Sequence, residues 1–209
     1  MKKTIVVLGG SFNPPTKAHE HILSDAIRQT DSAFGIFVPS SHAYVSRKMK
    51  RQRTGNQVYT EAQRYAMLSM ICEGKDYLKI DTCEYGDDGR GHTFETLQKI
   101  QSKYPDYKIL FVIGDDKLSI IPRWHSAKEF FQNFGFVVCC RNQYGQTTGK
   151  QFIQQHPVLK NYTNIFQFAE ITPEDISSTQ ARLAIMQHDD TKLFQICSAN
   201  VAKYLKTIR

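Results

Sequence analysis

Six short apolar segments recur along this 209-residue chain, and stretches with helical periodicity lie between them. The segments are rich in the β-branched and aromatic residues that favour strands. They cover residues 4–8, 33–39, 77–81, 107–114, 134–140 and 164–170. The helical patterns cover residues 19–29, 60–71, 93–103 and 125–131. Strands that alternate with helices predict right-handed crossovers between parallel neighbours.

This alternation predicts an α/β fold with a doubly wound, Rossmann-like parallel sheet and flanking helices. Two further helical patterns, at residues 177–186 and 199–206, predict a short C-terminal helical region. The least regular stretches, residues 40–57 and 142–157, are expected to be long surface loops. Because no linker or repeat interrupts the chain, we expect a single domain that spans residues 1–209.

The net charge indicates which classes of partner the protein can bind, and the cysteines indicate the redox state of its compartment. The net charge of +7 suits an acidic partner, which includes nucleic acid, anionic lipid and multiply phosphorylated small molecules. The five cysteines are an odd number without a C-x-x-C pair, which indicates reduced thiols and no zinc site. No apolar run is long enough to cross a bilayer, so we expect a soluble, cytoplasmic protein with no membrane partner.

The stretch "GGSFNPPTKAH" at residues 9–19 directly follows the first expected strand. Ligands of open parallel sheets bind at the carboxyl ends of the strands, so this junction is the first place to expect chemistry. Its glycines allow the backbone to approach a ligand, and amides at the start of the next helix favour an anion. The stretch matches neither G-x-G-x-x-G nor the P-loop pattern, which argues against a dinucleotide-binding dehydrogenase and a P-loop NTPase.

The same stretch resembles the first signature of the nucleotidyltransferase superfamily, a glycine turn followed by (H/T)-x-G-H. Thr16 and His19 match the ends of this tetrad, and Ala18 stands where the family has glycine. A structural turn with a histidine at the start of a helix is the alternative interpretation of this motif alone.

A second stretch, "ISSTQAR" at residues 176–182, is similar to the ISSTxxR motif that the family carries near its C-terminus. From the residues alone, Ser177 or Ser178 is expected to cap a helix whose free amides face a triphosphate. Arg182, one turn later, is expected to pair with phosphate oxygens. The alternative is an ordinary serine cap with a solvated arginine.

Between the two motifs, the resemblance narrows to nicotinate (or nicotinamide) mononucleotide adenylyltransferases. "GHTFETL" at residues 91–97 resembles the YTxDTL segment of that branch, and "FVIGDDKLSIIPRWHSAKEF" resembles its F-I-x-G-x-D-x-L segment with the following Trp. The chain departs from the branch after the second strand, where "VPSSHAYVSRKMKRQR" replaces a proline-rich turn that carries a lysine. Whether His42, Lys48 or Lys50 supplies that phosphate contact stays open.

The resemblance implies transfer of AMP from ATP to nicotinate mononucleotide, which forms deamido-NAD and pyrophosphate in NAD biosynthesis. The attacking phosphate is already an anion, so catalysis needs positioning and charge stabilisation rather than a general base. The catalytic residues implied are Thr16, which donates a hydroxyl, and His19, either protonated or donating through one nitrogen. Mg²⁺ is expected to arrive with ATP as part of the substrate, and no metal is expected on protein side chains.

The resemblance also implies two sets of binding residues. The ATP set is Gly9, Gly10, Ser11, Phe12, His19, Gly114, Asp115, Ser177, Ser178 and Arg182. The mononucleotide set is Asn13, Thr93, Phe94 and Trp124. Asp116 is an equal alternative to Asp115 for the ATP ribose, and Trp124 is either a stacking platform for the pyridine or a core residue.

Two other functions stay open. A pantetheine-phosphate adenylyltransferase shares the first motif, but "HTFETL" and Trp124 have no obvious counterpart in it. A non-catalytic module that binds a phospho-ligand or nucleic acid has no need of Thr16, His19, Ser178 and Arg182 together. The expected partners are therefore ATP and a pyridine mononucleotide, without nucleic acid, and a homo-oligomer is left open.

Overall fold

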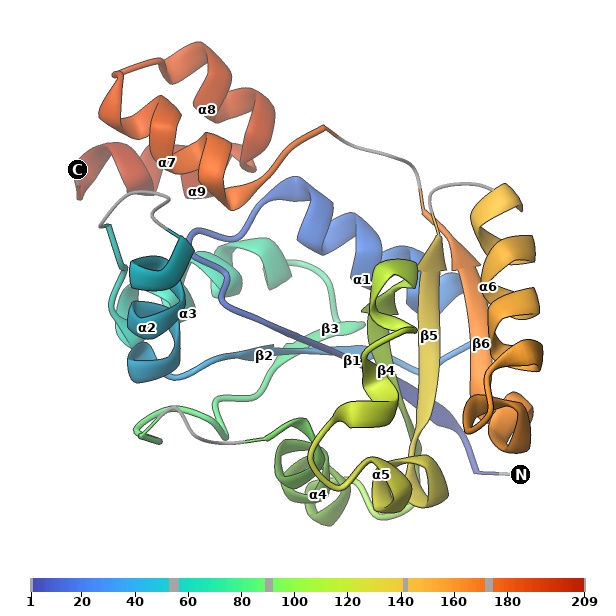
Figure 1. Ribbon diagram of the computed structural model, residues 1–209. Helices are drawn as coiled ribbons and strands as arrows, with labels where there is room; N and C mark the ends of the chain where they lie inside the picture. The colour runs from blue at the N-terminus through green and yellow to red at the C-terminus, as the bar shows by residue number, and fades with distance from the viewer. Residues whose placement is uncertain (1, 53–56, 89–91, 141–142, 172–174, 209) are drawn as a thin grey trace. The chain divides into compact units, whose positions relative to one another are not determined.

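The computed structural model describes residues 2–52, 57–88, 92–140, 143–171 and 175–208. Within them, six strands form one sheet in the order β3-β2-β1-β4-β5-β6 (Figure 1). The strands are β1 (Thr4–Gly10), β2 (Gly35–Pro39), β3 (Leu78–Ile80), β4 (Lys108–Gly114), β5 (Gly135–Cys140) and β6 (Phe166–Glu170). The pairs β1–β4, β4–β5 and β5–β6 are parallel. This is the strand order of a Rossmann-like fold, so the predicted fold class and all six predicted strands are confirmed.

The helices of the described residues correspond to every predicted helical pattern and add others. The α-helices are α1 (Lys17–Gln29), α2 (His42–Gln52), α3 (Glu61–Cys72), α4 (Thr93–Lys103), α5 (Ala127–Asn133), α6 (Gln143–Gln155), α7 (Ser178–Met186), α8 (Asp190–Ile196) and α9 (Ala199–Thr207). Short 3₁₀ turns are η1 (Asp115–Lys117), η2 (Ile121–Arg123) and η3 (Leu159–Ile165). In the part of the chain that the structure describes, none of these helices has the length and apolar character that a bilayer crossing requires.

The two stretches expected to be long loops contain helices, so that prediction was wrong. Residues 40–57 contain α2, although residues 53–56 of that stretch lie outside the described residues. The described side chains that α2 buries are Val45 and Met49, which form a narrower apolar stripe than that of a typical surface helix. Residues 142–157 contain α6, which carries two glycines and two threonines and therefore has low helix propensity. Tertiary packing stabilises it, because Gly149 lies so close to Phe168 that a Cβ there would be 2.9 Å from the ring.

Contacts divide the chain into two compact units. Unit 1 comprises residues 1–8, 22–36 and 92–173, and unit 2 comprises residues 9–21, 37–91 and 174–209. Unit 1 has its core along β4 and β5, where Ile109, Phe136 and Val138 are buried. In unit 2, α3 packs on β3 and α9, and α7 packs on α8. The single domain expected from the sequence stays a prediction.

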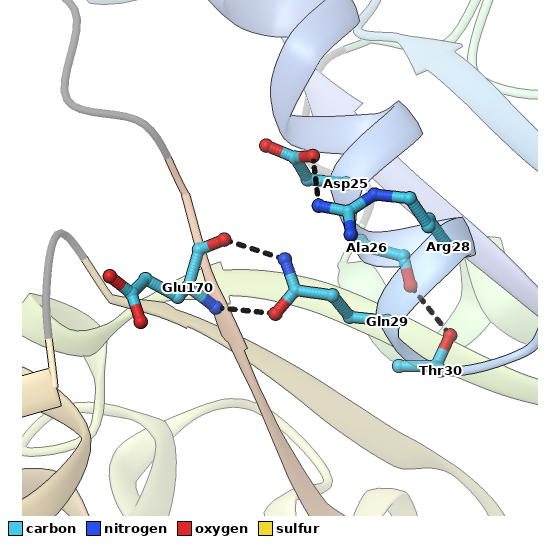
Figure 2. A network of polar contacts seen from close by, with 6 residues as sticks. All are labelled: Asp25, Ala26, Arg28, Gln29, Thr30 and Glu170. Atoms are coloured by element: carbon cyan, nitrogen blue, oxygen red, sulfur yellow. Dashed lines mark hydrogen bonds and ion pairs between the residues drawn. The ribbon is translucent and has the colours of Figure 1, made fainter.

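Strand β6 is the last strand of the sheet, and a side chain covers part of its free edge (Figure 2). The Ile171 amide donates to Cys140 of β5 at 2.9 Å, so the backbone groups of Glu170 point away from β5. Gln29, the last residue of α1, accepts from the Glu170 amide at 2.9 Å and donates to the Glu170 carbonyl at 2.6 Å. The glutamine amide thus pairs with the edge as another peptide would, which hinders addition of a further strand.

The five cysteines are free thiols, as the sequence predicted. Burial raises the pKa of Cys139 and of Cys197 to about 12, so both stay protonated and unreactive at neutral pH. They fill the cores of their units as small apolar side chains.

Candidate functional site

The glycine loop, defined here as residues 9–16, belongs to unit 2 and joins β1 to α1. Four of its carbonyl oxygens accept hydrogen bonds from side chains of the same unit. Ser11 accepts from Arg64 Nη1 at 3.0 Å, Asn13 from Arg182 Nη1 at 2.7 Å, Pro14 from Ser178 Oγ at 2.8 Å and Pro15 from Cys197 Sγ at 3.6 Å. The loop is therefore fixed by donors from α3, α7 and the segment between α8 and α9.

Asn13 anchors the same loop through its side chain, which is only 1% exposed. Its Nδ2 donates to the Gln57 carbonyl at 2.9 Å, and its Oδ1 accepts from the Tyr59 amide at 2.8 Å. Both polar atoms of the side chain are thus used within unit 2. The contact with the mononucleotide expected for Asn13 stays a prediction.

His19 lies in the first turn of α1 and is tied to Thr16. The Thr16 amide donates to His19 Nδ1 at 3.0 Å, and the Thr16 hydroxyl lies 2.9 Å from the same nitrogen. Because a backbone amide can only donate, Nδ1 is the acceptor and the neutral ring carries its proton on Nε2. The Phe12 ring meets the imidazole edge-on, with centroids 5.1 Å apart.

The environment of His19 keeps its ring neutral. Burial, followed by the nearby positive charge of Lys48, lowers the pKa of His19 to about 4. At pH 7 the side chain is therefore a donor through Nε2 and not a cation. Of the two states expected from the sequence, the geometry favours donation through one nitrogen.

Lys48 of α2 lies at the glycine loop, because its Nζ donates to Ser11 Oγ at 3.2 Å. The other two residues considered for this position are placed differently: Lys50 is exposed, and the His42 backbone amide donates to Glu61 at 2.8 Å. Among these three, Lys48 is the cation that reaches the loop. Because the sequence predicted a loop here, the helical spacing that turns Lys48 toward the glycine loop was missed.

The second motif forms the start of α7. Ser177 is the N-cap, and its side chain accepts from the Gln180 amide at 3.2 Å, which confirms one of the two expected caps. Ser178 and Arg182 both donate to the glycine loop, and Arg182 also donates to Thr179 Oγ1 at 3.2 Å. Arg182 is buried, with 5% of its surface exposed, and it holds the glycine loop through the Asn13 carbonyl. Its expected contact with phosphate stays a prediction.

Arg64 supports the glycine loop and was not among the residues singled out in the sequence. It lies on α3 and is fully buried. Its position relative to Met67, Leu68 and Ile71 follows the i+3, i+4 and i+7 spacing of an apolar helix stripe. An arginine within such a stripe is the signal that the sequence offered.

In unit 1, β4 ends at Gly114, and Asp115 follows directly in η1. The residues there line a pocket of about 510 Å³, formed by Asp115, Asp116, Leu118, Ser119, Tyr144, Gly145, Thr148, Gly149 and Phe152. Asp116 pairs with Lys117 at 2.6 Å and covers Gly114, where a Cβ would lie 2.5 Å from Asp116 Oδ1. The Asp115 side chain forms no hydrogen bond or ion pair with the described residues, whereas the Asp116 side chain, which is 66% exposed, pairs with Lys117.

Unit 1 also holds the residues expected to bind the mononucleotide ring. Trp124 is half-buried and packs against Phe111, Phe130 and Phe136, with ring centroids 5.9 to 6.3 Å apart. Phe94 packs against Phe134 with centroids 5.9 Å apart. Trp124 is thus a partly accessible ring in contact with three phenylalanines. A role as a stacking platform stays a prediction.

The start of α4 places Thr93 beside a pair of histidines in the same unit. The rings of His92 and His125 stack with centroids 4.2 Å apart, and His125 Nε2 lies 3.5 Å from Glu95 Oε1. His92 precedes α4 as its N-cap residue and makes no side-chain cap hydrogen bond. The contact expected between the amides near Thr93 and a ligand carboxylate is not tested by this geometry.

Comparisons with known proteins agree with this arrangement. A family model described as cytidylyltransferase-like matches residues 7–184. A Listeria monocytogenes protein named "Probable nicotinate-nucleotide adenylyltransferase" is 28% identical over 144 residues, which are 69% of this chain and 73% of the relative. A protein of the same name from Clostridium acetobutylicum is 28% identical over 190 residues, which are 90% of each chain.

Among solved structures, the chain is similar to Plasmodium falciparum nicotinic acid mononucleotide adenylyltransferase complexed with NaAD. The TM-score is 0.67 at 18% identity, and the match covers 99% of this chain and 96% of that chain. At this identity, the similarity shows a shared fold.

Proposed function

Because this chain belongs to the cytidylyltransferase-like family, we propose that it is a nicotinate-nucleotide adenylyltransferase. It transfers AMP from ATP to the phosphate of nicotinate mononucleotide and releases deamido-NAD and pyrophosphate. The observation that carries the proposal is the state of His19, which is neutral, tied to Thr16 through Nδ1 and left with an Nε2–H to donate. The names of the two relatives support the choice of reaction and of substrate.

In the proposed reaction, the mononucleotide phosphate attacks the α-phosphorus of ATP, and the bond to pyrophosphate breaks. The attacking oxygen is already an anion, so no side chain has to remove a proton. His19 Nε2–H donates to a phosphate oxygen whose charge grows in the transition state, and Lys48 adds a positive charge beside the loop. Mg²⁺ would arrive with ATP as part of the substrate and would neutralise part of the charge on its phosphates.

The glycine loop suits phosphate because Arg64 bonds the Ser11 carbonyl on the protein side. The Ser11–Phe12 peptide is planar, so its carbonyl points to one side and the Phe12 amide points to the other. The Asn13 and Pro14 carbonyls are each followed by a proline, which has no amide hydrogen, so their hydrogen bonds only hold the loop. Ser11 and Phe12 present amides to phosphate in the proposal, with Gly9 and Gly10 allowing close approach. Ser178 and Arg182 contribute by holding the loop, in addition to the phosphate contacts expected from the sequence.

The remaining roles are assigned by residue type and accessibility. Asp115, beside Gly114, accepts hydrogen bonds from the ATP ribose hydroxyls in the proposal, because Asp116 is engaged by Lys117. Trp124 stacks on the pyridine ring, and the amides of Thr93 and Phe94 receive the nicotinate carboxylate. Asn13 holds the loop and is retained as a predicted contact of the mononucleotide. A cytoplasmic location remains a prediction.

The test is a side-by-side assay of pyrophosphate release. The purified protein is incubated with ATP and Mg²⁺ and with nicotinate mononucleotide, nicotinamide mononucleotide or 4′-phosphopantetheine, and the products are identified by mass spectrometry. We expect deamido-NAD with the first substrate and the highest kcat/KM of the three. Turnover of 4′-phosphopantetheine alone would identify the pantetheine enzyme instead. Absence of pyrophosphate with every substrate would indicate a binding module.

A further inference from the structure

Arg64 is a charged residue in a position that packing alone would give to an apolar one. The helix α3 begins with a capping box, in which Thr60 accepts from the Gln63 amide at 3.2 Å and Gln63 accepts from the Thr60 amide at 2.9 Å. The capping box fixes the start of α3 and ends at Gln63, the residue that directly precedes Arg64. The arginine then faces the interior of unit 2 with 0% of its surface exposed. Lone arginines are rarely buried completely, because loss of hydration is costly.

The guanidinium of Arg64 is poorly compensated. Nη1 donates to the Ser11 carbonyl, whereas Nε and Nη2 are buried without a hydrogen-bond partner among the described residues. The guanidinium carbon lies 5.5 Å from the centre of the Tyr85 ring. Burial lowers the pKa of Arg64, and the nearby Tyr85, Glu61 and Glu84 oppose that shift. Buried, partly unsatisfied donors reduce stability, so stability does not explain why an arginine occupies this position.

The one hydrogen bond that Arg64 does make determines the direction of a loop peptide. The Ser11–Phe12 peptide plane has its carbonyl turned toward Arg64, so the Phe12 amide points to the opposite side. Phe12 has a positive φ of 43°, a conformation that a non-glycine residue adopts at a cost. The hydrogen bond from Arg64 holds the peptide that directly precedes this residue. The contact therefore links a buried charge on α3 to an amide that faces the proposed ATP phosphates.

We propose that Arg64 is a positioning residue for ATP. It holds the Ser11 carbonyl, orients the Phe12 amide and places a buried positive charge next to the glycine loop. This inference rests on the proposed function, since it takes the loop to be the phosphate site. Arg64 does not touch the phosphates in this proposal. It acts through the loop, and it does so on the ATP side of the reaction only.

A structural role and a positioning role predict different results for Arg64→Met. Methionine fills similar space without a charge, and replacement of a buried ion by an apolar side chain is often neutral for stability. A positioning role therefore predicts a folded variant whose thermal midpoint lies within about 5 °C of the wild type, with weakened ATP binding. A purely structural role predicts a lower midpoint and equal losses for both substrates.

The experiment compares Arg64→Met, Arg64→Lys and Arg28→Met with the wild type. Arg28 is a matched control, because its side chain is 71% exposed and its loss removes the same formal charge. For each protein we measure binding of a non-hydrolysable ATP analogue with Mg²⁺ by calorimetry, KM for both substrates and the thermal midpoint. Arg64→Met should bind the analogue roughly 10- to 100-fold more weakly and leave KM for the mononucleotide within about twofold.

The two other variants test whether the loss of the charge and hydrogen bond of Arg64 causes the weaker ATP binding. Arg64→Lys keeps the charge and can still donate to Ser11, so it should recover at least about a third of the lost affinity on a logarithmic scale. Arg28→Met should bind the analogue as the wild type does. Wild-type affinity in Arg64→Met, or equal losses for both substrates, would overturn the proposal.

Two further outcomes are covered by the design. If Arg64→Met does not fold, Arg64→Gln replaces it, because the glutamine amide is neutral and can still donate a hydrogen bond. Arg64→Gln must then also weaken binding of the ATP analogue while it leaves KM for the mononucleotide nearly unchanged. If the wild type binds the ATP analogue but does not use nicotinate mononucleotide, the proposed function fails. A loss of analogue binding in Arg64→Met would still support the positioning role in that case.

Discussion

The glycine loop of unit 2 and the Asp115 pocket of unit 1 differ in how their polar groups are held. In the loop, four carbonyls accept hydrogen bonds from side chains, and two of these donors, Arg64 and Arg182, are buried arginines. In the pocket, Asp115, Asp116 and Tyr144 are exposed, and the Asp115 carboxylate forms no hydrogen bond with the described residues.

This difference corresponds to two kinds of task. Stabilising charge in a transition state requires donors that are fixed before the substrate arrives, because reorganisation during the reaction costs free energy. Binding a ribose or a ring tolerates side chains that adjust. We therefore expect changes at the loop to affect kcat or ATP binding strongly, and changes in unit 1 to affect substrate choice more moderately.

The largest effect should come from His19→Ala. Loss of the Nε2–H donor should lower kcat roughly 100- to 1,000-fold, or about 3 to 4 kcal/mol, with little change in stability. His21→Ala is the matched control, since His21 lies two residues later on the same helix and is exposed. Steady-state kinetics of both variants provide the measurement. Near-normal turnover in His19→Ala would remove His19 from the mechanism.

Substrate choice in unit 1 should give the next largest effect. Nicotinate mononucleotide forms charge-assisted hydrogen bonds that the amide form lacks, so its kcat/KM should be roughly 10- to 100-fold higher. Trp124→Ala should impair both mononucleotides by removing the ring, and Trp124→Phe should restore part of the activity. Equal or reversed efficiencies for the two mononucleotides would show that the acid preference was assigned wrongly.

The pH dependence of stability tests whether the half-buried His19 ring is kept neutral. Between its ordinary pKa of 6.5 and the lowered value of about 4, the unfolded chain binds a proton at this residue and the folded chain does not. The free energy of unfolding should therefore fall as the pH drops through this range, on the order of 1–2 kcal/mol once partial solvation is allowed for. Urea unfolding of wild type and His19→Asn measures this, since asparagine does not titrate. Parallel stability curves for the two proteins between pH 7 and pH 4 would contradict a ring that stays neutral in the folded state.

The smallest effects are expected at Ser177 and Ser178, and they should show that these adjacent serines have different roles. Ser178→Ala removes the donor to Pro14 and should raise KM for ATP by roughly three- to tenfold, while the mononucleotide is spared. Ser177→Ala removes the cap of α7 and should lower the free energy of unfolding by about 1 kcal/mol without changing KM for ATP. Kinetics and urea unfolding of the two variants separate the roles. A reversed pattern would mean that the cap, and not the loop contact, serves ATP.

The sequence predicted the six strands because their apolar runs are continuous and bounded by turn residues. It missed α2 because that helix has a narrow apolar stripe, although its alanine, lysine, arginine and methionine residues favour a helix. It missed α6 because glycines and threonines lower its helix propensity, and packing stabilises it instead. The motifs pointed to Thr16, His19, Ser177 and Ser178, and the structure brings these residues together within unit 2.

The support for the loop could not be read from the sequence. The partners of Ser11 are Arg64 and Lys48, which lie 53 and 37 residues away along the chain. Local periodicity says nothing about contacts over such separations. The same limit applies to Asn13, whose side chain forms hydrogen bonds with residues 44 and 46 positions away along the chain.

The backbone amides of the glycine loop offer the most direct test of the claim that ATP phosphates bind there. A non-hydrolysable ATP analogue with Mg²⁺ is titrated into ¹⁵N-labelled protein, and amide shifts are followed by NMR together with the His19 Nε2–H. The account predicts the largest shifts at Ser11, Phe12 and His19, and none at Gln167 of β6. Saturable binding of the analogue that leaves the Ser11 and Phe12 amides unshifted would contradict it.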